Sequence, residues 1–192
     1  MEEPSVLQVA IRLFAELGYD GTTRQLVADA AGVGVQEVAD VWGDKRGLYL
    51  AAMRGAFEAE QAMLKEAVEN CPPGLQCLHE VADTYLDFHA DHPYIRALWM
   101  QRWMRDAADI GGLEDSFTRP LLRLVTRNVA DRLPPGSQVD VPYLLSMVIW
   151  CVHGFLASGV LAHGHGLRYA DDPRTRQEFR AQLHLLIDRM AG

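Results

Sequence analysis

Three side chains in one short stretch, residues 35–42, could form hydrogen bonds that distinguish one base pair from another. The Gln36 amide can pair with N6 and N7 of adenine. The carboxylates of Glu37 and Asp40 can each accept a hydrogen bond from N4 of cytosine. The apolar neighbours that could contact a thymine methyl group are Val35, Ala39 and Val41. This stretch therefore has the residue types needed to read a base sequence.

Side chains that read bases need others that hold the phosphates, and these are few here. Most hydrogen bonds between protein and DNA go to phosphates, from Arg, Lys, hydroxyl groups and backbone amides. The candidates are Thr22, Thr23, Arg24, Lys45 and Tyr49, with the helix amides that follow Gly34. Residues 35–42 contain no Lys or Arg, so two carboxylates would face a polyanion. We expect weak non-specific binding with a shallow salt dependence.

Two short helices are expected to position these residues. Thr23 can cap a helix over 24–31 that ends at Gly32, and a second helix over 35–42 ends at Gly43. An amphipathic helix over 4–17, stopped by Gly18, precedes them. This arrangement has the shape of a DNA-binding helix-turn-helix. The same spacing also fits an ordinary packing unit of three helices.

The rest of the chain is also predicted to be helical, because no stretch alternates apolar and polar residues long enough to propose a sheet. Asp44 can cap a long helix that begins at Lys45, and a Gly in the HGHG stretch at 163–166 is expected to end the eighth helix. The further helices are expected at 45–69, 75–91, 93–108, 113–133, 141–163 and 173–190. The fold class is therefore all-α with nine helices, divided into a domain at 1–45 and a larger one at 46–192.

Composition and charge narrow the classes of function. The 192 residues are 49% apolar and 23% charged, which is typical of a globular protein. The net charge of −8 is unusual for a protein whose main partner is a polyanion. No GxSxG, HExxH or Gly-rich phosphate loop occurs, so we expect a binding protein without a cofactor and not an enzyme.

An apolar and aromatic stripe in the larger part could line a ligand pocket. In YIRALWMQRWMRD, Trp99 and Trp103 are one helical turn apart, and Met100 and Met104 repeat this spacing. Residues on other helices that could face them are Tyr85, Phe88, Phe117, Met147, Trp150 and His153. The same spacing is also typical of plain core. A pocket of this composition would suit an apolar or aromatic ligand.

Histidines and cysteines are predicted to have structural roles. His79, His89 and His92 raise the question of a metal site. His89 and His92 are three residues apart at the end of a helix, but the spacing dictates no third ligand, so no metal is expected. Cys71, Cys77 and Cys151 are odd in number and form no CxxC, so no disulfide framework is expected. A reducing cytoplasm is the simpler compartment, and the N-terminus has no signal-peptide pattern.

One segment is apolar enough to raise the question of a membrane. Residues 141–162 contain no Asp, Glu, Lys or Arg, and that length could span a bilayer. Pro142, the mid-segment His153 and the absence of basic flanks argue against a span. A helix that is buried, or shared with a second subunit, explains the segment, so we expect no membrane partner.

Residues 13–49, LFAELGYDGTTRQLVADAAGVGVQEVADVWGDKRGLY, resemble the N-terminal signature of TetR-type transcriptional regulators. The residues that carry the resemblance are Phe14, Gly18-Tyr19, Thr22-Thr23, Val27-Ala28, Ala31-Gly32-Val33 and Gly43-Asp44-Lys45. The resemblance implies a homodimer, joined through helices at about 141–163 and 173–190, on a pseudo-palindromic double-stranded operator. It also implies that a small molecule in the larger domain releases the DNA.

Departures from the family pattern fall where DNA would be read. Val35 stands at a position that is often basic in the family, Ala39 at one that is often Tyr, and Asp40 at one that is often His. Lys45 matches the family's phosphate-contacting lysine. A repressor with an unusual operator is therefore the first hypothesis. The alternative is a ligand sensor or protein-interaction module in which DNA binding is weakened or lost.

Overall fold

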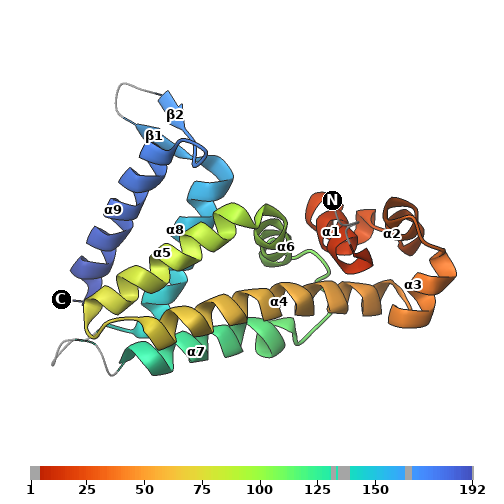
Figure 1. Cartoon of the computed structure of the whole chain (residues 1–192), viewed down its shortest axis with the longest axis horizontal. Helices are drawn as coiled ribbons and strands as arrows, with labels where there is room; N and C mark the ends of the chain where they lie inside the picture. The colour runs from red at the N-terminus through yellow and green to blue at the C-terminus, as the bar shows by residue number, and fades with distance from the viewer. Residues whose placement is uncertain (1–4, 131–132, 134–138, 163–165, 192) are drawn as a thin grey trace. The chain divides into compact units, whose positions relative to one another are not determined.

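The structure, a computed structural model, describes residues 5–130, 133, 139–162 and 166–191 of the chain (Figure 1). Within these ranges nine α-helices occur in the predicted order, which confirms the all-α fold class. They are α1 (Val6–Gly21), α2 (Arg24–Ala31), α3 (Val35–Trp42), α4 (Lys45–Asn70), α5 (Leu75–Asp91), α6 (Pro93–Trp103), α7 (Arg119–Val129), α8 (Val141–Ser158) and α9 (Pro173–Ala191).

The first three helices form the predicted helix-turn-helix unit, and α2 and α3 have the predicted bounds. The Thr23 hydroxyl accepts a hydrogen bond from the Leu26 amide at 3.1 Å, which caps α2. Val27, Ala28 and Val38 are fully buried between the helices. A small side chain at Ala28 lets α2 and α3 cross closely.

Gly18 interrupts α1, as predicted, and the chain then adds one more turn to Gly21. Its φ of 70° lies in the region that favours glycine, and a Cβ there would lie 3.2 Å from Oδ1 of Asp106. The next amide, that of Tyr19, donates to Oδ2 of Asp106 at 2.8 Å. The loop after α6 therefore holds the end of the main part of α1, against which α6 packs.

The sixth helix ends earlier than predicted, at Trp103 and not at residue 108. Arg105 and Ala107, on either side of Asp106, have φ values of 71° and 50°, which no helix can contain. The Arg102 guanidinium donates to the carbonyl oxygens of Asp106 and Ala107 at 3.2 and 2.7 Å. It also holds both carboxylate oxygens of Glu114. These bonds replace the helical ones and fix the loop.

The predicted helix over 113–133 is divided in two. A π-helical turn, η1 (Glu114–Thr118), leads into α7, which ends at Val129. Residues 131–132 and the Pro-Pro-Gly break at 134–136 lie outside the described residues.

The chain forms two compact units, and one boundary between them falls within α4. One contains residues 1–60 and 92–117, and the other contains residues 61–91 and 118–192. The helix α4 is continuous from Lys45 to Asn70 and contributes residues to both units. The packing of α6 on α1 places residues 92–117 in the first unit.

In the second unit, α5, α8 and α9 pack together (Figure 1). Arg180 of α9 pairs with Asp83 and Asp87 of α5 at 3.3 and 2.7 Å. Phe155 of α8 and Phe179 of α9 stack with their ring centroids 3.9 Å apart. Apolar burial and ion pairs therefore both join the last helix to its neighbours.

The eighth helix ends at Ser158, before the HGHG stretch that was expected to cap it. Gly159 ends it with a φ of 70°, and a Cβ there would lie 2.3 Å from the Arg168 carbonyl oxygen, so only glycine fits. A short antiparallel hairpin follows, formed by β1 (Val160–Ala162) and β2 (Gly166–Arg168). The sequence predicts no sheet, because strands of three residues are too short to show alternation. Residues 163–165 lie outside the described ranges.

The length and composition of α8 alone would allow it to cross a membrane, as would those of many core helices. Within the single chain, 39% of the residues of this helix are buried. Tyr143 and Trp150, seven residues apart on α8, are 58% and 60% exposed. The helix therefore has one buried face and one apolar face that the single chain leaves open.

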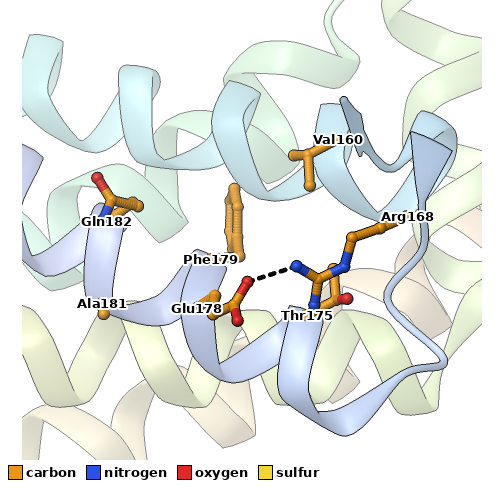
Figure 2. A pocket seen from close by; sticks show the side chains of 7 residues that line it. All are labelled: Val160, Arg168, Thr175, Glu178, Phe179, Ala181 and Gln182. Carbon is orange, nitrogen blue, oxygen red and sulfur yellow. Dashed lines mark hydrogen bonds and ion pairs between the residues drawn. The ribbon is translucent and has the colours of Figure 1, made fainter. Parts of the chain in front are cut away.

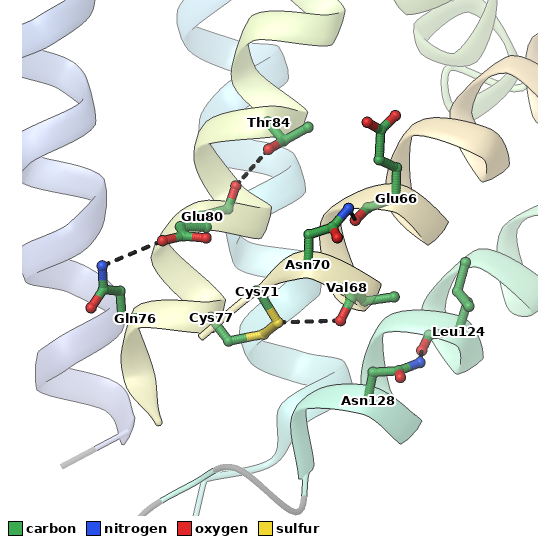
Figure 3. Close-up of a disulfide and its surroundings, with 10 residues drawn as sticks. All are labelled: Glu66, Val68, Asn70, Cys71, Gln76, Cys77, Glu80, Thr84, Leu124 and Asn128. Carbon is green, nitrogen blue, oxygen red and sulfur yellow. Dashed lines mark hydrogen bonds between the residues drawn. A yellow bond between two sulfur atoms is a disulfide. The ribbon is translucent and has the colours of Figure 1, made fainter. Parts of the chain in front are cut away.

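The structure corrects the expectation about the cysteines, because Cys71 and Cys77 form a disulfide (Figure 3). The segment Pro72-Pro73-Gly74 turns the chain between α4 and α5 and brings the two Cα atoms to 4.8 Å. That separation lies in the range that a disulfide requires. The absence of a CxxC motif hid a pair that the turn brings together. Cys151 is a free thiol.

Candidate functional site

The helix α3 carries most of the residues that were predicted to read bases. Val35, Gln36, Glu37 and Asp40 are exposed, and Ala39 is half-buried. The residue that anchors the opposite face is Val38, which is fully buried, and the half-buried Trp42 ends the helix. Val41, on the same helix, is exposed as well. The predicted base-reading face is thus accessible.

Both carboxylates of α3 have partners within the helix. Glu37 accepts a hydrogen bond from the Gly34 amide at 2.9 Å, so it satisfies one of the amides at the helix start. Its negative charge also lies at the positive end of the helix dipole. The Gln36 amide donates to Oδ1 of Asp40 at 2.8 Å. Gln36 still has one N–H and its carbonyl oxygen, which are the two groups that adenine requires.

The cations beside α3 keep their charge available for phosphates. Arg24 donates to the carbonyl oxygen of Gly43. Lys45 donates to the carbonyl oxygen of Asp20 at 3.3 Å, and its Nζ lies 4.4 Å from the centre of the Tyr19 ring. These partners carry no negative charge, so they orient the two side chains without neutralising them. Thr23 is exposed at the start of α2, where backbone amides are also available.

Two residues predicted to contact phosphates are instead part of the scaffold. Thr22 is fully buried, and its hydroxyl donates to the carbonyl oxygens of Leu13 and Gly18 at 3.1 and 2.9 Å. Tyr49 is fully buried against Phe14 and Tyr19, and burial raises the pKa of its phenol. Neither side chain can reach DNA without local unfolding.

One cation at the start of α4 is absent from the predicted phosphate-binding set. Arg46 is exposed and follows Lys45 directly. Burial raises the pKa of Tyr19, and the positive charge of Arg46 opposes that shift. The consecutive Lys and Arg at the start of α4 were the signal that could have identified it.

The second unit contains a buried polar cluster from the predicted ligand-binding set. The Tyr85 hydroxyl of α5 lies 2.8 Å from Nε2 of His153 on α8. The His89 ring lies between them, with centroids 4.3 Å from Tyr85 and 4.6 Å from His153. All three are buried, and Phe88 packs edge-on against His89. Met147, one of the predicted ligand residues on α8, is half-buried.

The predicted ligand residues of the first unit have several different environments. Trp99 is buried, Met100 and Trp103 are half-buried, and Met104 is 74% exposed. Phe117 is buried against Phe57, with ring centroids 5.4 Å apart. In the second unit, Trp150 is exposed, as described above. Met104 and Trp150 therefore face solvent in the single chain and do not line an interior cavity.

A buried carboxyl in the first unit was not foreseen. Glu60 of α4 is 4% exposed; burial raises its pKa to about 8, and a hydrogen bond from Trp99 opposes the shift. It follows Met53 and Ala56 and precedes Leu64 at intervals of three or four residues, and all of these are buried. This spacing on the apolar side of α4 was the signal that could have found it.

A pocket of about 600 Å³ lies between α9 and the hairpin (Figure 2). Its lining residues are Val160, Arg168, Thr175, Glu178, Phe179, Ala181 and Gln182, none of which belongs to the predicted ligand set. The Arg168 guanidinium is bound by Glu178 at 2.6 Å and by Asp172 at 3.3 Å. The cation is therefore neutralised within the fold.

The histidines and cysteines do not gather into a metal site among the described residues, where no group of three or more His, Cys, Asp or Glu side chains is suitably placed. His79 and His184 stack between α5 and α9 with centroids 4.2 Å apart. Each also meets a carboxylate at 2.8 Å, Asp188 and Asp83 respectively. His92, the third candidate, is exposed where α6 begins.

Comparison with known proteins gives a consistent picture. Residues 6–52 match the family model "Bacterial regulatory proteins, tetR family". The HTH-type transcriptional regulator YezE of Bacillus subtilis is 38% identical over 64 residues, which are 33% of each chain. RutR of Escherichia coli, also an HTH-type transcriptional regulator, is 25% identical over 153 residues, 78% of this chain and 70% of RutR. The chain thus matches only a third of YezE.

The fold extends the similarity beyond the N-terminal segment. A bacterial regulatory protein of the tetR family from Rhodococcus RHA1 superposes with a TM-score of 0.72 at 18% identity. The match covers 97% of this chain and 95% of the Rhodococcus protein. At this identity the likeness shows a shared fold.

Proposed function

We propose that this chain is a TetR-type regulator, as the match of its N-terminal residues 6–52 supports, and that it acts as a cytoplasmic repressor. It binds double-stranded operator DNA through α3 and leaves that DNA when a small molecule binds to the larger part. The observation that carries the proposal is the exposed face of α3, where Gln36 retains both groups that adenine requires.

In the proposed DNA-binding domain, residues 1–45, some side chains contact bases and others contact phosphates. Gln36 reads an adenine, while Val35 and Ala39 approach thymine methyl groups. Thr23, Arg24 and Lys45 hold phosphates, and Arg46 extends this set. With so few cations and a net charge of −8, non-specific affinity is low and salt dependence shallow.

The proposed effector site lies in the second unit, at the cluster of Tyr85 and His153. These two buried groups can exchange their mutual hydrogen bond for one to a ligand, and Phe88 and Met147 add apolar contacts. The effector is therefore a mainly apolar or aromatic molecule with one polar group. The dimer is proposed to form through the open face of α8 together with α9, where Tyr143, Trp150 and Leu185 are exposed.

A mobility-shift titration on the DNA that flanks the protein's own gene tests the proposal. Lys45→Ala should weaken binding to every sequence, whereas Gln36→Ala should cost about 1–3 kcal/mol at one or two base pairs only. Lys65→Ala is the matched control, because Lys65 is exposed on the same helix α4 but lies far along it, paired with Glu69. A metabolite extract should release the shifted DNA.

The alternative is a ligand sensor or protein-interaction module in which DNA binding is weakened or lost. The acidic balance of the chain, and the lack of Lys or Arg in α3, favour it. Absence of any specific shift at low salt, with or without extract, would make this alternative the better proposal. Equal losses on all sequences for Gln36→Ala would show that α3 does not read bases.

A further inference from the structure

The turn between α4 and α5 joins two cysteines that differ in accessibility (Figure 3). Cys71 follows the last residue of α4 and is half-buried, whereas Cys77 lies in the first turn of α5 and is fully buried. The Sγ atom of Cys71 is 3.4 Å from the Val68 carbonyl oxygen, which can accept a hydrogen bond from the thiol when the pair is reduced. The turn therefore accommodates both the dithiol and the disulfide.

We propose that Cys71 and Cys77 form a reversible oxidation site that responds to peroxides and adjusts DNA binding through the turn between α4 and α5. The disulfide is present in the structure, while a bacterial cytoplasm keeps thiols reduced except in redox-sensing or catalytic pairs. The part that concerns DNA binding, and the cytoplasmic location used in this argument, rest on the proposed function; the disulfide itself does not.

The chemistry needs only a peroxide and the two thiols. The Cys71 thiol, the more accessible of the two, loses its proton, and the thiolate attacks an oxygen of hydrogen peroxide. An S–O bond forms, the O–O bond breaks, and the leaving hydroxide takes up the released proton to give water. The Cys77 sulfur then attacks the Cys71 sulfenic acid, and the S–S bond forms as a second water leaves. The positive end of the α5 dipole favours negative charge on Cys77 during this step. A cellular dithiol returns both electrons and restores the thiols.

The third cysteine provides an internal comparison. Burial raises the pKa of the Cys151 thiol, so little thiolate is present at neutral pH. Among the described residues Cys151 is also the one cysteine without a disulfide partner. Because Cys71 has Cys77 beside it to complete a disulfide and Cys151 has no such neighbour among the described residues, peroxide should convert Cys71 to a stable product before Cys151.

Oxidation is expected to fix the turn in place. Closing a loop with six residues of sequence separation restricts the unfolded chain and ties the end of α4 to the first turn of α5. Because α4 begins at Lys45 and is continuous to Asn70, a constraint at its end bears on the helix that carries a proposed phosphate contact at its start. The disulfide thus lies at the end of α4, the helix whose first residue is proposed to contact DNA.

The test uses the full-length chain, reduced, desalted and treated with hydrogen peroxide. Mass spectrometry after alkylation should show the loss of two hydrogen atoms and of two alkylatable thiols, with Cys151 still alkylated. Reduced protein should melt about 5–9 °C below oxidised protein. In Cys77→Ser a sulfenic acid at Cys71 should be trapped by dimedone, whereas Cys71→Ser should give slow or no trapping. Cys151→Ser is the control and should oxidise as the wild type does.

Three outcomes would overturn the oxidation site. One is that all three thiols remain alkylatable after peroxide, and a second is that Cys151 is trapped as fast as Cys71. The third is a disulfide that a cellular dithiol reductant such as thioredoxin cannot open in the folded protein. Thiol mass and alkylation remain readable in either serine variant even if its melting temperature falls.

The effect on DNA binding is measured separately, with the same operator fragment. Oxidised and reduced protein should differ in affinity at least threefold, and Cys71→Ser should abolish this difference. Equal affinities, with oxidation confirmed by mass, would overturn the regulatory role and leave the oxidation site standing. No specific binding in either state would count instead against the proposed function.

Discussion

The Glu60 carboxyl makes stability depend on pH in an unusual direction. Its pKa is raised from 4.5 to about 8 by burial, so between these values the folded chain holds a proton that the unfolded chain has lost. Stability is therefore fully present below pH 4.5 and falls as pH rises towards 8. At about 1.4 kcal/mol per pKa unit, this loss is at most about 5 kcal/mol. Glu60→Gln should remove the pH dependence, as measured by urea unfolding at pH 5 and pH 8.5.

Glu58→Gln is the control, because Glu58 is exposed on the same helix α4. It should leave the pH slope of the wild type unchanged. The slope is the readout, since the amide could shift stability at all pH values alike. A slope that survives unchanged in Glu60→Gln would show that groups other than Glu60 cause it.

At the scale of single residues, the sequence allowed us to predict which side chains of α3 are exposed, but not which hydroxyl groups are buried. Gln36 and Asp40 are exposed because Val38, on the other side of a short helix, fills the core. Thr22 and Tyr49 have polar groups too, yet packing against α1 and its neighbours buries them. Burial of this kind depends on contacts with other elements, which the local pattern does not contain.

At the scale of elements, the loop after α6 is expected to stabilise the end of α1. Asp106→Ala removes the acceptor of the Tyr19 amide and should cost about 1–2 kcal/mol in the free energy of unfolding. Chemical denaturation measures this loss. Asp109→Ala, an exposed carboxylate in the same loop, should change stability by less than about 0.5 kcal/mol. Equal costs for the two variants would contradict a specific role for Asp106.

The predicted helix bounds were correct where a capping residue or a glycine within the same stretch ends the helix. They were wrong where groups distant in the sequence end it. Thr23 and Gly32 set α2 from within the sequence. In contrast, α6 stops at Trp103 because Arg102 and Asp106 bind groups outside the helix. The end of α8 is set by Gly159, whose neighbour is the Arg168 carbonyl on the returning strand. These partners become known only once the chain has folded.

At the scale of the whole molecule, the open face of α8 predicts a dimer. Trp150→Glu places a charge on that face, and it should raise the dimer dissociation constant at least tenfold. Light scattering at micromolar concentration, coupled to size exclusion, should then show a monomer. Met104→Glu, which charges an exposed methionine in the other compact unit, should leave the dimer intact. A wild-type chain that is already monomeric would refute the interface.

The division into compact units was beyond what the sequence could show. Breaks such as Pro72-Pro73-Gly74 mark the ends of helices. A boundary between compact units, however, depends on which helices pack together, and the breaks do not reveal that. Here α6 packs on α1 although about 70 residues separate them, and α4 belongs to both units. Long-range packing of this kind has no local pattern.

The placement of the tryptophans gives the chain its own optical reporters. Trp42 ends α3, Trp99 and Trp103 belong to α6, and Trp150 stands on the open face of α8. An indole in apolar surroundings emits at shorter wavelength than one in water, so the buried Trp99 and the exposed Trp150 emit at different wavelengths. Chains that keep a single indole would thus report, without any attached dye, on operator contact, the α6 region and subunit pairing.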